Sequence, residues 1–140
     1  MNLKMSVIQD FWIISKSGFV LFNRVFDPNM KTQLFGALMS ALNSFAEHVV
    51  EGEGLSKFEL HNKKYFIKKT VNYIFIASSF KNIKEKKIKV ELEEIINKFL
   101  EEYPDEWFEN WNFDLNVFKS FDITLDGKLD NTVKYFWSGF

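Results

Sequence analysis

The chain has 140 residues, of which 46% are hydrophobic and 18% aromatic, and its formal net charge is −1. This composition excludes an intrinsically disordered chain and predicts a single globular domain over residues 1–140. Cysteine is absent and no apolar run reaches membrane-spanning length, which excludes disulfides, thiolate chemistry and a spanning helix, so we expect a cytoplasmic protein.

The first predicted elements are two strands that form a hairpin. Residues 7–15 and 19–22 are rich in apolar side chains, and Ser17 and Gly18 supply the turn between them. Glycine adopts positive φ at little cost, so the second strand folds back antiparallel to the first. Bulky apolar side chains occupy both faces of the first strand, which is typical of a strand in the middle of a covered sheet.

A long amphipathic helix is predicted to follow the hairpin. Asp27 is a suitable N-cap, and Pro28 suits the first helical position because its missing N–H costs nothing there. Apolar side chains recur at spacings of three and four over residues 34–50, and Gly52 and Gly54 end the helix. Small residues in its first half would allow the backbone to approach a sheet or a partner closely.

Three further strands are predicted to form a meander over residues 55–60, 65–67 and 73–79. The first of these alternates apolar with charged residues, which is typical of an edge strand. The last is apolar on both faces, so we expect it to pair with the strand at residues 7–15 at the centre of the sheet.

Two helical segments are predicted to complete the chain. Residues 84–103 carry an apolar stripe that Pro104 ends, and a last helix is expected to start at Asp114 and to continue to Trp137. The loop between them contains Trp107, Phe108, Trp111 and Phe113. Its rings either pack the two helices on the sheet or form a secondary patch for a partner, since tryptophan is enriched in interfaces.

Charge is strongly separated along the chain. Residues 57–89 contain ten lysines and two glutamates, whereas residues 90–114 contain nine acidic residues and one lysine. Such blocks are typical either of solvated faces or of binding faces for partners of opposite charge.

The sequence lacks residue patterns that predict a reaction. No glycine-rich phosphate loop is present, the two histidines lack metal-ligand spacing, and Ser78 has no glycine-flanked nucleophile elbow. We therefore predict no catalytic residue, no metal site and no cofactor, and a protein that is not an enzyme. Lysines alternate with aromatics in residues 63–69, but those rings are needed for the core and Arg24 is the only arginine, so no nucleic-acid partner is expected.

The order of elements, ββαβββαα, resembles the longin domain over nearly the whole chain. Residues 11–22, the helix from Pro28 and residues 73–79 carry the resemblance. It implies an α+β, profilin-like fold in which a five-stranded antiparallel sheet has one helix on one face and two C-terminal helices on the other. The related roadblock domains share the sheet but begin with a helix, and the pattern is most similar to stand-alone archaeal longin-like proteins.

The resemblance also implies a non-catalytic interaction module in membrane-traffic-like regulation. Its implied partner is a small GTPase or another longin or roadblock-type subunit, with a homodimer as one form of the latter. In longin domains partners often dock on the first helix and the neighbouring edge strand. The matching positions are Gln33, Phe35, Gly36, Met39, Asn43, Leu55, Lys57 and Glu59.

Two other functions remain alternatives at this stage. A small-molecule sensor of PAS or GAF architecture also wraps helices around a five-stranded antiparallel sheet, but it needs an internal pocket. A lipid-surface adaptor would use the lysine-rich segment from Lys81 to Lys89, provided that these side chains face one way. The second alternative would make the protein peripheral to membranes.

Overall fold

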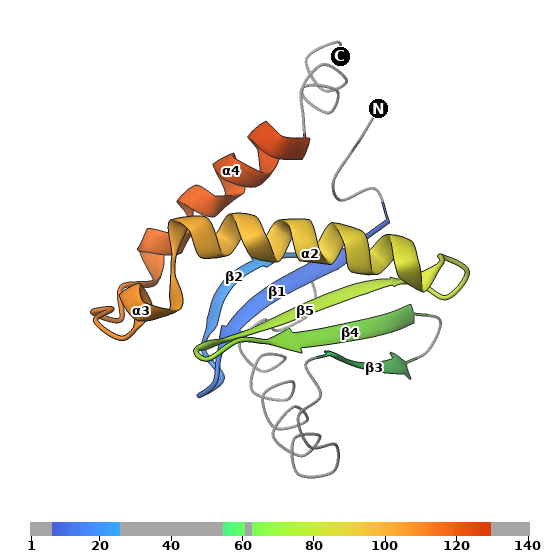
Figure 1. Ribbon diagram of the computed structural model, residues 1–140, viewed down its shortest axis with the longest axis horizontal. Helices are drawn as coiled ribbons and strands as arrows, with labels where there is room; N and C mark the ends of the chain where they lie inside the picture. The colour runs from blue at the N-terminus through green and yellow to red at the C-terminus, as the bar shows by residue number, and fades with distance from the viewer. Residues whose placement is uncertain (1–6, 26–54, 61–62, 130–140) are drawn as a thin grey trace.

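The fold is an antiparallel sheet with helices packed across one face (Figure 1), in a computed structural model that describes residues 7–25, 55–60 and 63–129. The strand order is β2-β1-β5-β4-β3, and every neighbouring pair is antiparallel. The predicted α+β class is confirmed. The strands are β1 (Asp10–Ser15), β2 (Val20–Arg24), β3 (Leu55–Leu60), β4 (Lys63–Lys69) and β5 (Tyr73–Phe80).

The β1–β2 hairpin forms as the sequence predicts. Gly18 has a φ of 99°, a value that favours glycine, and its N–H donates to the Ser15 carbonyl at 2.9 Å. The register shifts between Ile13 and Ile14, which marks a bulge in the pairing with β2.

The two strands that are apolar on both faces lie inside the sheet. β1 pairs with β2 and β5, and β5 pairs with β1 and β4. All six residues of β1 and the first seven of β5 are buried. The expected central pairing of these strands is confirmed, as is the edge position of β3.

One face of the sheet carries the larger core, and Phe99 is at its centre. Helix α2 (Glu85–Glu102) lies across this face (Figure 1) and buries Ile88, Leu92, Ile95, Ile96 and Phe99. The fully buried Phe99 ring contacts five others, with centroid distances of 4.8–6.0 Å: Tyr73, Phe75, Tyr103, Phe118 and Phe121. Sheet, helix and C-terminal segment therefore meet at one side chain.

The opposite face carries a second buried cluster, whose members include Trp12, Ile14, Ile67, Ile74 and Ile76. None of the helices among the described residues contributes to it. The helix predicted from Pro28 lies outside the described residues, so its position on this face stays a prediction.

The segment after α2 was predicted as a loop followed by one helix from Asp114, and the structure divides it further. A short helix α3 (Asp105–Phe108) and a 3-10 turn η1 (Leu115–Phe118) precede α4 (Ser120–Leu129). The Asp114 side chain accepts from Asn116 N–H at 3.0 Å and so caps η1.

The helix predicted from Asp114 is interrupted by a tertiary contact. The Tyr103 hydroxyl donates to the Val117 carbonyl at 2.7 Å and lies 2.7 Å from Ser120 Oγ. A continuous α-helix would use that carbonyl within the helix, so the tyrosine replaces a helical hydrogen bond. Residues 130–137 of the predicted helix lie outside the described residues.

The Tyr73 hydroxyl donates to the buried Tyr103 carbonyl at 2.9 Å. Tyr73→Phe leaves that carbonyl without its donor, so the free energy of unfolding should fall by about 1–2 kcal/mol at neutral pH, measured by chemical denaturation. Burial, followed by the charges of Asp105 and Tyr103, raises the pKa of Tyr73 above its ordinary value of 10.0.

Because the pKa of Tyr73 is raised, the difference in free energy of unfolding between wild type and Tyr73→Phe depends on pH. The neutral phenol stabilises the fold below about pH 10, and this contribution is lost as pH rises further, because the unfolded chain ionises first. The difference between wild type and Tyr73→Phe should therefore shrink from about pH 9 to about pH 11. A constant difference over that range would contradict the assignment.

Candidate partner interface

The strand half of the predicted interface lies at the sheet edge. β3 pairs with β4 alone among the described residues, and the Lys57 and Glu59 side chains are exposed. Register places Lys57 opposite Phe66, which belongs to the core beneath α2. Leu55 belongs to the same strand. The helix half, Gln33, Phe35, Gly36, Met39 and Asn43, lies outside the described residues.

Two ion pairs connect this edge to the start of α2. Lys57 Nζ lies 2.8 Å from Glu85 Oε2, and Lys81 Nζ lies 3.4 Å from Glu59 Oε1. The hydrogen bond from Lys57 lowers the pKa of Glu85 below its ordinary value. Exposed pairs such as these contribute little to stability, but they hold Lys57 toward the start of α2 and Glu59 toward the turn before it. The charged side of β3 therefore faces α2, and the predicted docking surface stays a prediction.

The other sheet edge is held in a similar way. Arg24 at the end of β2 donates from Nη2 to Asp122 Oδ1 at 2.7 Å and to the Asp122 carbonyl at 3.2 Å. Asp122 belongs to α4, so this interaction fixes the last described helix to β2. Charged side chains thus flank both edge strands of the described sheet.

The aromatic loop divides into buried and exposed rings. Trp111 is buried, stacks on Phe108 with centroids 5.1 Å apart, and donates from Nε1 to the Asp114 carbonyl at 3.0 Å. Trp107 packs on Tyr103 and remains 36% exposed. Of the secondary patch Trp107, Phe108 and Trp111, the first alone has a substantially exposed side chain.

Phe113 is the most exposed ring of this loop, and it was predicted as part of the loop but not of the secondary patch Trp107, Phe108 and Trp111. Its side chain is 76% exposed and its φ is 65°, a conformation that costs a non-glycine residue about 1–2 kcal/mol. Its centroid lies 5.3 Å from that of Trp111. Nothing in the local sequence signals this conformation, because a bulky aromatic residue disfavours it.

A buried polar cluster joins three strands at one end of the sheet. Asp10 Oδ2 accepts from Lys63 Nζ and from Ser78 Oγ, each at 2.8 Å. The neighbouring Ser79 hydroxyl donates to the Val7 carbonyl. Asp10, Ser78 and Ser79 are all buried, so these contacts satisfy polar groups within the sheet. They give the two serines a structural role, and both histidines of the chain lie outside the described residues.

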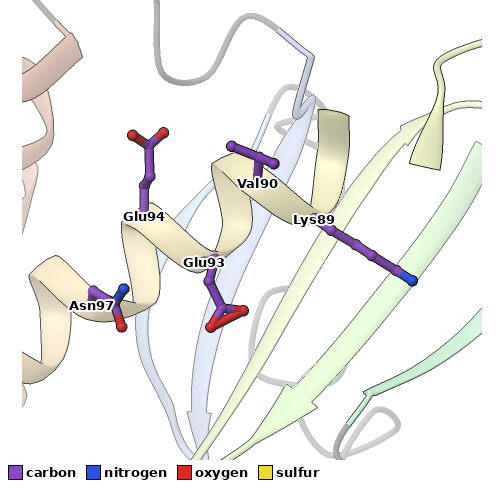
Figure 2. Close-up of a pocket in the computed structure, with 5 residues that line it drawn as sticks. All are labelled: Lys89, Val90, Glu93, Glu94 and Asn97. Atoms are coloured by element: carbon purple, nitrogen blue, oxygen red, sulfur yellow. The ribbon is translucent and has the colours of Figure 1, made fainter. Parts of the chain in front are cut away.

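The hollow on the outer side of α2 is not an enclosed ligand pocket. It has a volume of about 390 Å³, and all of its lining residues belong to α2. Figure 2 shows their side chains leaving the helix in different directions rather than converging. The lining residues are Lys89, Val90, Glu93, Glu94 and Asn97. A sensor needs a mostly apolar, enclosing cavity, and this hollow does not supply one.

The described residues contain neither a metal-binding cluster nor a helix suited to crossing a membrane. Residues 7–25, 55–60 and 63–129 contain no group of three histidine, aspartate or glutamate side chains that could hold a metal ion. Within the same ranges, no helix combines the length and apolar character that crossing a membrane requires.

Several solved structures share this fold. An MglB structure with a tetrameric arrangement superposes with a TM-score of 0.57 at 10% identity, covering 65% of this chain and 75% of that one. MglB from Myxococcus xanthus gives 0.56 at 11% identity, covering 71% and 91%. A roadblock/LC7 domain from Streptomyces avermitilis gives 0.52 at 13% identity, covering 67% and 87%.

These similarities define the fold class of the chain. No family model matches the sequence, and no curated protein matches it. At such low identities the structural similarity shows the fold alone. The chain has a longin-like, profilin-like fold of the kind found in MglB and roadblock/LC7 domains.

The two tryptophans of the aromatic loop should differ in their effect on stability. Trp111→Ala should reduce the free energy of unfolding by about 3–5 kcal/mol, because a buried ring and its hydrogen bond are lost. Trp107→Ala should cost about 1–2 kcal/mol, because part of the ring is already in water. Chemical denaturation of both variants measures the difference, and equal losses would contradict the packing described.

Phe113→Gly should leave the free energy of unfolding unchanged or raise it by up to about 1 kcal/mol. Relief of the positive φ offsets the lost ring contact and the greater entropy of the unfolded chain. Ile123→Gly is the matched control, since this exposed residue lies within α4 and the substitution should cost about 1 kcal/mol. If both variants lose the same stability, the conformation at Phe113 carries no strain.

Proposed function

We propose that this chain is a non-catalytic interaction module that binds a small GTPase or a second chain of longin or roadblock type. The observation that supports it best is the edge strand β3, which has a single neighbour among the described residues. Among the described residues no strand pairs with its outer backbone groups, so a partner strand could be added there, a mode of recognition in which main-chain hydrogen bonds supply affinity.

The shared fold supports a second roadblock-type chain as one partner. One MglB structure of this fold has a tetrameric arrangement. The small GTPase follows from the resemblance of residues 11–22 and 73–79 to longin domains. Regulation of membrane traffic and an archaeal type are parts of the same proposal.

The shape of the described core favours binding on the surface. Both faces of the central strands are filled by large side chains, including the fully buried Trp12, Phe75 and Phe99. A core packed in this way holds a rigid sheet, and a rigid sheet presents an edge in a fixed geometry. We infer that the candidate interface comprises eight residues: Gln33, Phe35, Gly36, Met39, Asn43, Leu55, Lys57 and Glu59.

Calorimetry tests this proposal against small GTPases in both nucleotide states and against longin and roadblock chains. Lys57→Ala/Glu59→Ala should weaken binding about tenfold or more, because two side chains beside the docking edge are removed. Gln33→Ala/Asn43→Ala should weaken it if the helix half contributes.

The control is a second exposed lysine–glutamate pair far from β3. Lys98 Nζ and Glu101 Oε1 lie 3.6 Å apart near the end of α2, and Lys98→Ala/Glu101→Ala changes the same residue types. This variant should bind as wild type does. Absence of binding to every chain tested would refute the proposed function, and equal weakening by both double variants would refute the β3 edge as the interface.

A further inference from the structure

The start of α2 carries an exposed group of lysines that the fold does not neutralise. We call Lys84, Lys86, Lys87 and Lys89 the α2 lysine patch. All four side chains are exposed. Within the part of the chain that the structure describes, none of their ammonium groups forms an ion pair or a hydrogen bond.

Neighbouring lysines on the sheet differ from the patch because their ammonium groups are held: Lys64 donates to the Ile83 carbonyl at 3.4 Å, and two others have an acidic partner. Lys57 pairs with Glu85 at 2.8 Å, and Lys68 pairs with Glu93 at 2.9 Å. Glu85 is the sole acidic residue between positions 81 and 89. Lys57 holds the Glu85 carboxylate and Lys89 also acts on it electrostatically, so the charges of Lys84, Lys86 and Lys87 remain open to an external anion.

Helix stability does not explain these lysines. The first turn of a helix favours acidic side chains, because the aligned peptide dipoles place partial positive charge there. Glu85 is the one acidic residue in the first turn of α2, and the last turn has no basic residue. The charges along α2 thus oppose the preference at both ends, which points to an external role for the patch.

The two ends of α2 carry opposite charge, although the two charge blocks of the sequence touch at its middle, where Lys68 pairs with Glu93 at 2.9 Å. The patch lies where β5 passes into α2, whereas Glu101, Glu102 and the acidic start of α3 lie at the other end (Figure 1). An 18-residue helix is about 27 Å long, roughly three screening lengths at physiological salt. Glu101 and Glu102 are therefore largely screened from an anionic surface at the patch, whereas Glu91, Glu93 and Glu94 lie within two turns of it.

We propose that the α2 lysine patch binds the surface of an anionic phospholipid bilayer. Lysine is a compact charge on a flexible stem, and it suits a fluid layer of phosphates and carboxylates better than the fixed geometry of a nucleic acid, for which arginine is preferred. The buried rings of Tyr65 and Phe66 offer no stacking platform for bases. This proposal is independent of the partner binding proposed above.

Co-sedimentation with vesicles tests the proposal. One set contains phosphatidylcholine alone, and the other contains about one-third phosphatidylserine. Wild-type protein should sediment with the second set at about 0.1 M NaCl and be released at about 1 M, where the screening length falls from about 10 to about 3 Å. Free inorganic phosphate at millimolar concentration should not compete, because a single small ion does not replace a surface.

A matched pair of variants locates the binding. Lys86→Ala/Lys87→Ala should reduce partitioning about 25-fold, since each lysine near an anionic membrane contributes about fivefold. Lys98→Ala/Lys119→Ala removes the same charge at the opposite end and should leave partitioning close to that of wild type. Circular dichroism and the denaturation midpoint confirm that both variants remain folded.

Three results would overturn the proposal. Equal sedimentation with both vesicle sets would show that charge is not recognised, and equal loss in the two variants would show that the patch is not the site. The third is self-association at low salt that Lys86→Ala/Lys87→Ala abolishes, with no vesicle binding by the wild type. That result would show that the patch binds the acidic end of a second copy of this chain instead of a bilayer.

Discussion

The packing of Phe99 against the sheet is the interaction on which the other described elements depend. This one ring contacts Tyr73 and Phe75 of β5, Tyr103 at the end of α2, and Phe118 and Phe121 of the C-terminal segment. Removing a buried ring of this size costs about 3–5 kcal/mol, a large share of the 5–15 kcal/mol that stabilises a typical domain. The packing of α2 on β5 therefore contributes to the placement of α4, together with the Arg24–Asp122 interaction at β2.

The same placement of α2 decides where charge lies on the molecule. Because α2 runs across the sheet from the end of β5, its lysine-rich start lies beside the β3 edge, where Lys57 and Glu59 meet Glu85 and Lys81. The acidic end lies with α3. A net charge close to zero thus conceals two ends of opposite sign, and each end can meet a different class of partner.

Strong local patterns were interpreted correctly from the sequence. The helix predicted at residues 84–103 forms as Glu85–Glu102, and the strand predicted at residues 55–60 is β3 at the sheet edge. Features that depend on contacts between distant residues were not predicted correctly from the sequence. The helix predicted from Asp114 is divided by the Tyr103 hydroxyl, and no local signal reveals that Phe108 and Trp111 pack inward while Phe113 does not.

The sequence by itself determined the hairpin turn at Gly18, the buried character of β1 and β5, the charged edge strand and the two charge blocks. These follow from backbone preference and from the period of the side chains, which act over a few residues. The tertiary structure alone decided that Lys57 and Glu59 face α2, which rings of the aromatic loop are buried, and that the basic and acidic blocks meet through Lys68 and Glu93. These depend on contacts between residues far apart in the chain, and no local pattern encodes them.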